Sequence, residues 1–304
     1  MKACEAGLLG FLEKSPQFII PIYQRTYSWT EKECLQLWQD ILRAGRDDKI
    51  NVHFVGSIVY IEEGISQITS RSPVLVIDGQ QRLTTITLLL AALSRVVGER
   101  EPVKGFSASK ILKRYLVDED EEDDSHYKLL LTQTDKETLK SFVSGKEPPA
   151  DQSIRISQNY ELFHEWLVKH DAELETVCKG LSKLVIVDIA LTRNQDNPQL
   201  IFESMNSTGR ELSQADLIRN FVLMGLEPKL QTRLYREYWR PMEVEFGQEA
   251  YTSQFDSFMR HYLTYKTGAI PKESEVYELF KKHSNNSNVQ AAGIEELVRE
   301  VRSF

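Results

Sequence analysis

The feature that most constrains the fold is a short apolar strand that runs through a polar turn into a long apolar helix. Residues 73–77 are apolar throughout, the turn reads Asp78-Gly79-Gln80-Gln81-Arg82, and apolar residues then dominate residues 83–97. A strand without polar residues is typical of one buried on both faces, and a helix that is apolar around most of its circumference lies in a core. Gly98 is a typical residue to end such a helix. The stretch therefore predicts a central helix fed by a buried strand.

Further strands are expected on both sides of this unit. Residues 53–61 and 184–191 are rich in β-forming side chains. Gly56, within the first of them, leaves room for another backbone to approach closely. Residues 18–27 also have extended character, with Pro21 near the start. With the helices described next, these strands predict an α+β fold: a small mixed sheet with helices, plus a large helical part.

Helix-start signals recur along the chain. Thr30 and Glu33 have the spacing of a capping box. The helix that follows would bury one apolar stripe, made of Leu35, Trp38, Ile41 and Leu42. Pro198 stands at the first position of another helix, and Ser213 with Asp216 is a capping pair for a third.

Residues 104–183 follow a mostly helical pattern, interrupted by the acidic run 118–124. Blocks of like charge repel, so this run is expected to be a solvated, disordered loop and not a metal site. After Gly225 the chain is helical and rich in aromatic residues, and residues 283–288 are expected to be a linker.

Charge and cysteine content limit the functional class. Of 304 residues, 37 are Lys or Arg and 45 are Asp or Glu, which gives a net charge of -8. This argues against a general nucleic-acid coat protein but leaves a local basic site open, because binding depends on the patch. The three cysteines offer neither zinc spacing nor a redox pair, which favours a reduced, cytoplasmic compartment. No signal peptide is expected, and the longest apolar run, 88–93, is too short to cross a membrane.

The turn after the short strand has the residues of a phosphate site. A polar loop at a helix N-terminus offers backbone N–H groups and the positive end of the helix dipole. Gly79 lets the backbone approach a ligand closely, and Arg82 supplies a bidentate donor for phosphate oxygens. Asp78 can hold magnesium or orient an attacking water, while Gln80 and Gln81 can position that water or the phosphates. The simpler alternative is a strand-to-helix turn without a ligand. The chain has no Walker loop, which excludes a P-loop mechanism.

A second candidate site follows the helix that Pro198 starts. Asn206, Thr208 and Gly209 lie in a polar loop between two helices, where they can bind a base, a ribose or a phosphate. Arg219 can face the same ligand. The alternative is a plain helix–loop–helix corner.

The third candidate, residues 20–29, combines aromatic residues with one glutamine and one arginine. This mixture suits stacking on bases and binding of phosphate, although it equally suits a strand with aromatic core residues. We expect Tyr27 and Trp29 in the core. Tyr23, Gln24 and Arg25 are the better candidates for a site.

Four segments taken together resemble the N-terminal domain of GmrSD-type restriction proteins. They are residues 21–29 (PIYQRTYSW), 53–58 (HFVGSI), 76–85 (VIDGQQRLTT) and 206–220. Their order and spacing match over roughly residues 15–225. Each segment alone is weakly specific, whereas the combination is highly specific.

The resemblance implies a ParB/sulfiredoxin-like core, marked by the DGQQR motif, that binds and hydrolyses a nucleoside triphosphate, GTP or ATP, with Mg²⁺. It also implies defence against phage DNA with a modified base or backbone, through a C-terminal HNH nuclease domain. That nuclease motif is absent from this sequence, so the chain alone is not expected to cut DNA. Phosphorothioate-sensing members look closest in organisation. In them, the stretch matching Pro21, Tyr23, Gln24 and Arg25 is implied to meet the DNA backbone.

These expectations combine into one hypothesis. Residues 1–225 form a ParB-like NTPase domain with a helical insertion at about 104–183, and residues 226–304 form a helical region that leads to a linker and a nuclease domain. The expected catalytic residues are Asp78, Gln81 and Arg82, with Asp78 also the metal ligand. The expected nucleotide-binding residues are Gly79, Gln80, Asn206, Thr208, Gly209 and Arg219.

Two rival hypotheses remain open. In one, the chain is a modified-DNA-binding module whose nucleotide only regulates affinity. In the other, Asp78 and a metal nick DNA, which is weakened by the lack of a second carboxylate or histidine motif nearby. The preferred nucleotide, the modification that is sensed and the formation of a homo-oligomer are not fixed by the sequence.

Overall fold

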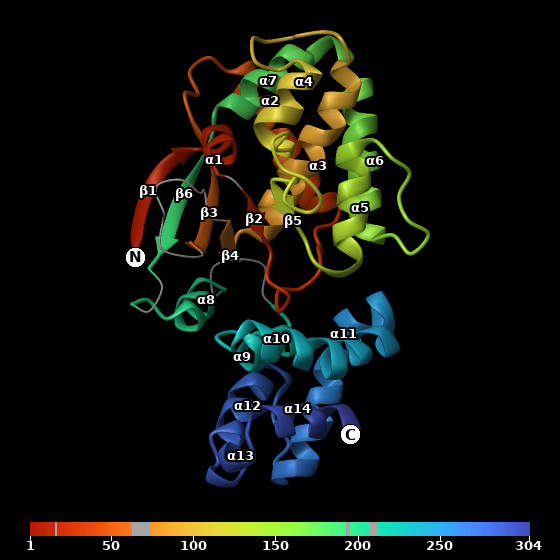
Figure 1. Ribbon diagram of the computed structural model, residues 1–304. Helices are drawn as coiled ribbons and strands as arrows, with labels where there is room; N and C mark the ends of the chain where they lie inside the picture. Colours follow the sequence, from red (N-terminus) through yellow and green to blue (C-terminus); the bar gives the residue numbers. More distant parts are fainter. Residues whose placement is uncertain (16, 63–72, 193–194, 207–211) are drawn as a thin grey trace. The chain divides into compact units, whose positions relative to one another are not determined.

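The computed structural model describes residues 1–15, 17–62, 73–192, 195–206 and 212–304 (Figure 1). The chain forms two compact units. The first, here called the sheet unit, consists of Met1–Pro21 and Thr26–Asp196, and the second, the helical unit, consists of Ile22–Arg25 and Asn197–Phe304. The division into an NTPase domain of residues 1–225 and a helical region of residues 226–304 concerns function, and it stays a prediction.

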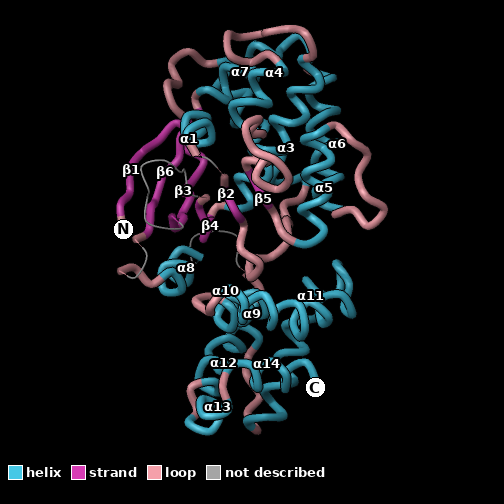
Figure 2. Tube along the Cα trace, in the orientation of Figure 1, coloured by secondary structure: helices cyan, strands magenta, loops and turns pink. Residues whose placement is uncertain are grey.

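Among the described residues, the sheet unit contains a six-stranded mixed sheet, drawn in magenta in Figure 2. Its strands are β1 (Lys2–Gly7), β2 (Phe18–Ile19), β3 (His53–Glu62), β4 (Val74–Asp78), β5 (Leu129–Leu130) and β6 (Leu184–Leu191), in the order β1-β6-β3-β4-β2-β5. β3 pairs parallel with β6 and antiparallel with β4. The α+β prediction is confirmed, and the strands predicted for β3, β4 and β6 agree with the structure to within one residue at each end.

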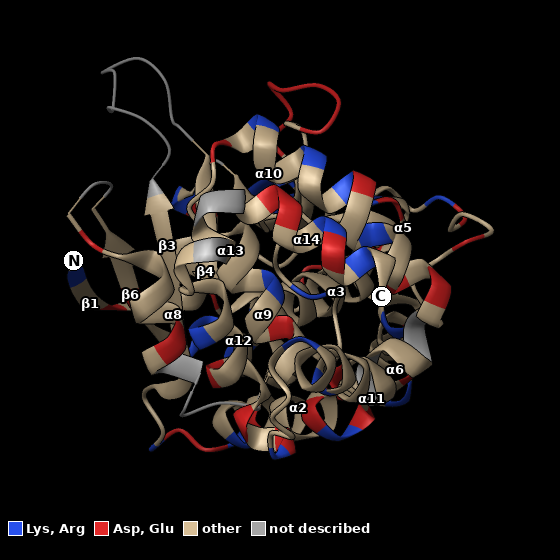
Figure 3. Cartoon of the chain, turned by 90° about the horizontal axis from the view of Figure 1, so that it is seen from below, with Lys and Arg blue, Asp and Glu red and all other residues tan. Residues whose placement is uncertain are grey.

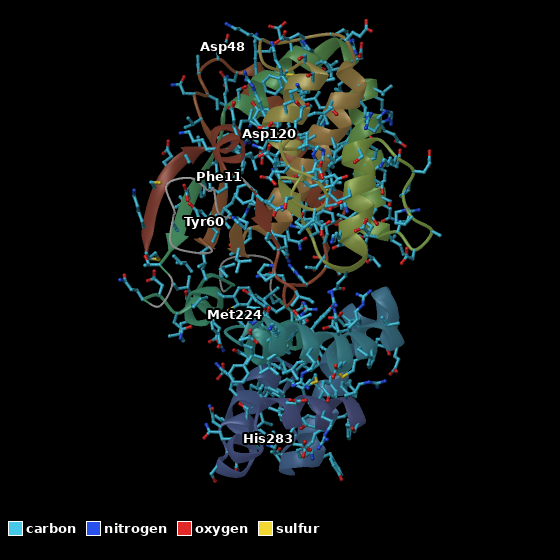
Figure 4. The ribbon with its side chains drawn as sticks, in the orientation of Figure 1. Phe11, Asp48, Tyr60, Asp120, Met224 and His283 are labelled. Atoms are coloured by element: carbon cyan, nitrogen blue, oxygen red, sulfur yellow. The ribbon has the colours of Figure 1, made fainter. Side chains whose placement is uncertain are left out.

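Helices pack on this sheet and on one another. They are α1 (Leu8–Lys14), α2 (Glu31–Arg46), α3 (Gln80–Val97), α4 (Ala108–Ile111), α5 (Gln133–Ser144), α6 (Ile154–Lys169) and α7 (Leu174–Ser182). Almost every residue of α3 is buried, and the helix packs against α4, α5 and α6, so the predicted central helix is confirmed. On β3, the ring of Tyr60 lies 5.9 Å from that of Phe11 in α1, measured between centroids (Figure 4).

Every described element of the helical unit is a helix. The α-helices are α8 (Pro198–Asn206), α9 (Gln214–Leu223), α10 (Pro228–Leu234), α11 (Arg240–Thr267), α12 (Val276–Ser284), α13 (Ser287–Ala292) and α14 (Ile294–Ser303), with a π-helix at Tyr235–Trp239 and a 3-10 helix at Glu273–Glu275. Its fully buried side chains include Trp239, Phe255, Tyr262 and Phe280. Because these large aromatic residues come from several helices, the unit has a core of its own. No helix in the described ranges is both long enough and apolar enough to cross a bilayer.

Most helix-start predictions are confirmed. Thr30 and Glu33 form both hydrogen bonds of a capping box at the start of α2, and the Ser213 hydroxyl caps α9. Trp38, Ile41 and Leu42 are buried as predicted, but Leu35 is 38% exposed. The buried face of α2 instead continues through Cys34 and Leu37.

Three expectations about loops and strands were wrong. The acidic run 118–124 is a compact turn, closed by a bridge between Val117 and Tyr127, in which the Asp124 carboxylate pairs with Lys136 and Lys140. Residues 283–288 are not a linker, because they form the end of α12 and the start of α13. Within the stretch 18–27 the strand itself covers Phe18–Ile19, with one further backbone bond from Ile20 to Leu130, and residues 22–25 belong to the helical unit.

Two glycines let α2 and α7 meet through their backbones. A β-carbon on Gly180 would lie 2.0 Å from the carbonyl oxygen of Ile41, and one on Gly45 would lie 2.0 Å from that of Thr176. Distances this short cannot be relieved by rotating a side chain, so any larger residue must push the helices apart.

We therefore expect Gly180→Ala to lower the free energy of unfolding by about 1–3 kcal/mol, the usual cost of overpacking. Gly10→Ala in α1 is the matched control, because a β-carbon there meets nothing within 4 Å. Alanine also favours a helix over glycine by about 1 kcal/mol. Urea unfolding of both variants measures the difference. Equal stability of the two would contradict the close contact.

Candidate functional site

The turn between β4 and α3 places backbone donors at the positive end of a buried helix. Gly79 adopts a left-handed conformation with φ 95°, and its carbonyl accepts the first helical hydrogen bond from Leu83 N at 3.0 Å. The N–H groups of Gln80, Gln81 and Arg82 precede that bond, so they have no acceptor within the helix. Donors in this position, reinforced by the helix dipole, suit an anion.

The turn also rests closely on β3, which explains the glycine at position 79. A β-carbon on Gly79 would lie 2.9 Å from the carbonyl oxygen of Ser57 and 3.1 Å from the side chain of Ile58. Together with the positive φ, this contact leaves room only for glycine. The backbone of the turn is therefore fixed by the strand behind it.

Arg82 lies across an irregularity in β3. Its Nη1 donates to the carbonyl oxygen of Ser57 at 2.8 Å, and a β-carbon on Gly56 would lie 2.5 Å from its Cζ. Gly56 has φ 118°, and the pairing of β3 with β6 shifts register between Phe54 and Ser57. A group does approach Gly56 closely, but it is the Arg82 guanidinium and not the backbone that was predicted.

Asp78 faces the same guanidinium. Its Oδ2 lies 3.9 Å from Arg82 Nη1, and both side chains are 31% exposed. At this distance and exposure the pair is a weak ion pair that adds little to stability. The arrangement instead leaves a carboxylate and a guanidinium accessible beside the backbone donors of the turn.

Gln81 points its carboxamide at a different part of the backbone. Its Oε1 accepts from the N–H groups of Ser28, at 2.9 Å, and Trp29, at 3.3 Å, and its Nε2 donates to the carbonyl of Thr26 at 3.4 Å. The carboxamide therefore holds residues 26–29 against the start of α3. Its predicted catalytic role stays a prediction.

A buried polar network continues from Gln81 along α3. The Tyr27 hydroxyl lies 2.7 Å from Thr85 Oγ1 and accepts from Asn159 Nδ2 at 3.0 Å, while Asn159 Nδ2 also donates to the carbonyl of Trp29. Asp135 Oδ2 accepts from Tyr27 N at 2.6 Å. Burial raises the pKa of Tyr27 well above its ordinary value, so the hydroxyl stays neutral. The network anchors Tyr27, whose predicted place in the core is confirmed.

Sequence reasoning missed Asn159 and Asp135. Asn159 stands in α6 on the same face as Ile156 and Phe163, both of which are fully buried. A polar residue within an apolar helical stripe was the available signal, because burial then requires partners. No comparable signal marks Asp135, whose partner is a backbone group 108 positions away.

In the helical unit, Arg219 is almost completely enclosed, with 1% of its side chain exposed. Its Nε donates to the carbonyl of Tyr23 at 2.9 Å, its Nη2 donates to Asp216, and its Nη1 donates to Glu243. Burial by itself lowers the pKa of Arg219, but Tyr251 and the carboxylates outweigh it, so the net shift is upward. Contact with a nucleotide, as predicted for Arg219, would require one of these buried bonds to break.

The other predicted residues of this stretch are largely outside the structural description. Asn206 ends α8, but its side chain is not among the described ones, and Thr208 and Gly209 lie outside the described residues. The N-terminus of α9 beyond them is firmly capped. Besides Ser213, Asp256 in α11 accepts from two of its backbone N–H groups, those of Gln214 and Ala215.

The stretch predicted to sense DNA is mostly buried. Tyr23 is 5% exposed and Gln24 is 4% exposed; Pro21 is also buried, whereas Arg25 is half-buried. Tyr23 and Gln24 are therefore enclosed in this structure, and their predicted role in sensing DNA stays a prediction. Their burial follows from the anchoring of residues 22–25 in the helical unit, where Arg219 binds the Tyr23 carbonyl.

Residues 8–223 match the family described as GmrSD restriction endonuclease, N-terminal domain. The match covers well over half of the chain, and the chain belongs to this family. It is thus a restriction-system domain of a defence protein that acts on modified DNA. None of the curated proteins matches the chain. The resemblance found in the four segments is confirmed at the level of the family, whereas a ParB-like core and phosphorothioate sensing stay predictions.

The contact between Gly56 and Arg82 can be tested by a double-mutant cycle. We expect Gly56→Ala to lower the free energy of unfolding, because the new methyl group displaces the guanidinium and the positive φ strains alanine by about 1–3 kcal/mol. In an Arg82→Ala background, only the backbone strain remains. The cycle should therefore give a coupling energy of about 0.5–3 kcal/mol. Strictly additive effects in urea unfolding would show that the two residues do not touch.

Proposed function

We propose that this chain is the nucleoside triphosphatase and DNA-sensing domain of an anti-phage restriction protein. The observation that carries the proposal is the fixed turn Gly79–Arg82, with backbone donors at the start of α3 and an accessible Arg82 beside Asp78. Membership of the restriction family supports the same function.

The chemistry of the proposed site is charge stabilisation by groups already in position. The N–H groups of Gln80 and Gln81 would receive phosphate oxygens, and Gly79 allows that close approach. Arg82, braced by its bond to Ser57, would offset the charge that develops on the transferred phosphoryl group. In phosphoryl transfer such positioning supplies most of the acceleration. Asp78, at the end of β4, would orient the attacking water.

Mg²⁺ fits the same place. In the described part of the chain, no three histidine, cysteine, aspartate or glutamate side chains gather as a metal site. Mg²⁺ in nucleotide sites uses only one or two carboxylates and takes its other ligands from phosphates and water. The single carboxylate of Asp78 is therefore sufficient to help hold it. When bound, the ion would neutralise part of the phosphate charge.

DNA is the expected macromolecular partner. The net charge is -8, and Lys and Arg alternate with Asp and Glu along helices such as α14 (Figure 3). Binding would thus rest on a local contact, with modest affinity that falls as salt rises. We retain Pro21, Tyr23, Gln24 and Arg25 as the proposed sensors of a phosphorothioate backbone or a modified base. Because Tyr23 and Gln24 are buried, sensing would require this segment to move. A C-terminal HNH nuclease domain would then carry out cleavage in the cytoplasm.

One observation favours a second function, that of a modified-DNA-binding module in which nucleotide is only a regulatory ligand. The Gln81 carboxamide is bound to the backbone of residues 26–29, so it is not placed to orient an attacking water. Phosphate release by the purified chain separates the two functions. Binding of triphosphate without release of phosphate would establish the regulatory role.

We expect Arg82→Ala to reduce the rate of triphosphate hydrolysis about 100-fold or more, the usual effect of removing a donor that stabilises developing charge. The matched control is Arg43→Ala, because Arg43 is an exposed arginine that pairs with the neighbouring Asp40. Phosphate release and circular dichroism should be measured together for both variants. Wild-type turnover by a folded Arg82→Ala variant would contradict the proposed role of Arg82 in hydrolysis.

We also expect the chain by itself to leave DNA intact, because its sequence lacks the His-Asn-His nuclease motif. Plasmids with and without base or phosphorothioate modification should be incubated with the protein in Mg²⁺ and in Mn²⁺. An Asp78→Asn variant serves as the control for a nuclease that uses this carboxylate. Metal-dependent cutting by the wild type that disappears in the variant would support the rival nicking function.

A further inference from the structure

We propose that Gln81 and Arg219 are positioning residues that hold the two ends of one short segment, residues 23–28, and thereby link the start of α3 to the helical unit. That this link transmits the state of a bound nucleotide to the helical unit rests on the proposed function, because α3 begins at the turn where the phosphates would bind. The link itself rests only on hydrogen bonds and on the path of the chain.

One end of the segment is fixed in the sheet unit. Gln81 Oε1 accepts from the N–H groups of Ser28 and Trp29, and the Tyr27 side chain is anchored by Thr85 and Asn159. Gln81 stands in the first turn of α3, directly before Arg82. Any ligand that shifts this first turn must therefore also shift the carboxamide that holds Ser28 and Trp29.

The other end is fixed in the helical unit by Arg219, whose Nε donates to the carbonyl of Tyr23 at 2.9 Å. Arg219 belongs to α9, and the same guanidinium binds Asp216 in that helix and Glu243 in α11. A planar guanidinium can serve three acceptors in fixed directions, which a lysine ammonium on a flexible stem cannot reproduce. The Tyr23 carbonyl is thus tied to the same group that joins α9 to α11.

The chain between the two anchored residues, Tyr23 and Ser28, is short. Only five residues of chain lead from Tyr23 to Ser28, a span of at most about 18 Å when fully extended. Tyr27 within this span is held at both its backbone N–H and its hydroxyl. A displacement of Ser28 that carries Tyr27 with it must be absorbed by residues 24–26 or passed on to the Tyr23 carbonyl. Passing it on would leave a buried guanidinium N–H without its acceptor, which is costly.

The two anchors also suggest how the enclosed residues of this stretch could take part in sensing. Gln24 and Arg25 lie between the anchored residues, so release at either end would alter their exposure. Sensing by this stretch and the state of the turn at α3 would then be coupled, and the coupling must act equally in both directions.

Hydrogen exchange followed by mass spectrometry tests the link without any ligand. In Gln81→Ala, we expect exchange to accelerate about fivefold or more at Ser28 and Trp29, as for the loss of one hydrogen bond. We also expect faster exchange in residues 22–25 and in α9. Gln39→Ala, a change at an exposed glutamine on α2, is the control and should alter neither region. Acceleration confined to residues 26–30 would overturn the link.

Arg219→Lys tests the other end while keeping the buried charge. Exchange should accelerate in residues 22–25 and extend to Ser28 and Trp29. Circular dichroism and the exchange of β6 and α7 serve as measures of folding. If the variant is folded and Ser28 and Trp29 exchange as in the wild type, the two anchors act independently and the proposal is wrong.

A nonhydrolysable triphosphate then tests the regulatory meaning, with its binding measured separately by calorimetry. Bound analogue should change exchange at the start of α3 and in α9 of the wild type, and the change in α9 should be lost in Gln81→Ala. A bound analogue that leaves α9 unchanged in the wild type would overturn the coupling. Failure of the analogue to bind would count against the proposed triphosphatase, while the ligand-free arms would still decide the link.

Discussion

The burial of α3 is the constraint on which the rest of the sheet unit depends. Because nearly all of its residues are enclosed, its polar side chains must find partners locally, and Thr85, Thr87 and Ser94 do so by donating to carbonyls one turn earlier. Outside the buried part of α3 lie Gln81 and Arg82 in the first turn and Arg95 with Val96 near the last. The backbone donors of the helix and Arg82 lie together at its N-terminus.

The geometry of that N-terminus depends on two glycines that serve different purposes. Gly79 lets the turn rest against β3, and Gly56 lets the Arg82 guanidinium lie directly over the strand. Both residues have positive φ, so each position combines a backbone requirement with a steric one. The result is an arginine whose position is set by the sheet and not by a flexible loop. Such preorganisation is what stabilisation of developing charge requires.

The helical unit buries a group of charged side chains. An arginine with two carboxylates forms its buried polar centre. Arg219 also binds the carbonyl of Tyr23, which belongs to the early segment Ile22–Arg25. Removing one member of a buried charged group leaves the others unpaired, which is far more costly than breaking a surface ion pair. Residues that looked like ligand contacts in the sequence, Arg219 and Gln81 among them, thus hold the backbone in place.

The sequence alone determined the elements whose cause is local. The capping box of Thr30 and Glu33, the cap at Ser213, the central helix after Gly79 and the strand at 184–191 follow from neighbouring residues, and four short motifs were enough to indicate the family. Only the tertiary structure decided which partners distant groups choose. The bonds of Gln81 to Ser28, of Asn159 to Tyr27 and of Arg219 to Tyr23 join residues 53, 132 and 196 positions apart. No local pattern encodes such pairings, because a polar side chain suited to a ligand is equally suited to a buried backbone group, and only the packing of the whole chain selects between them.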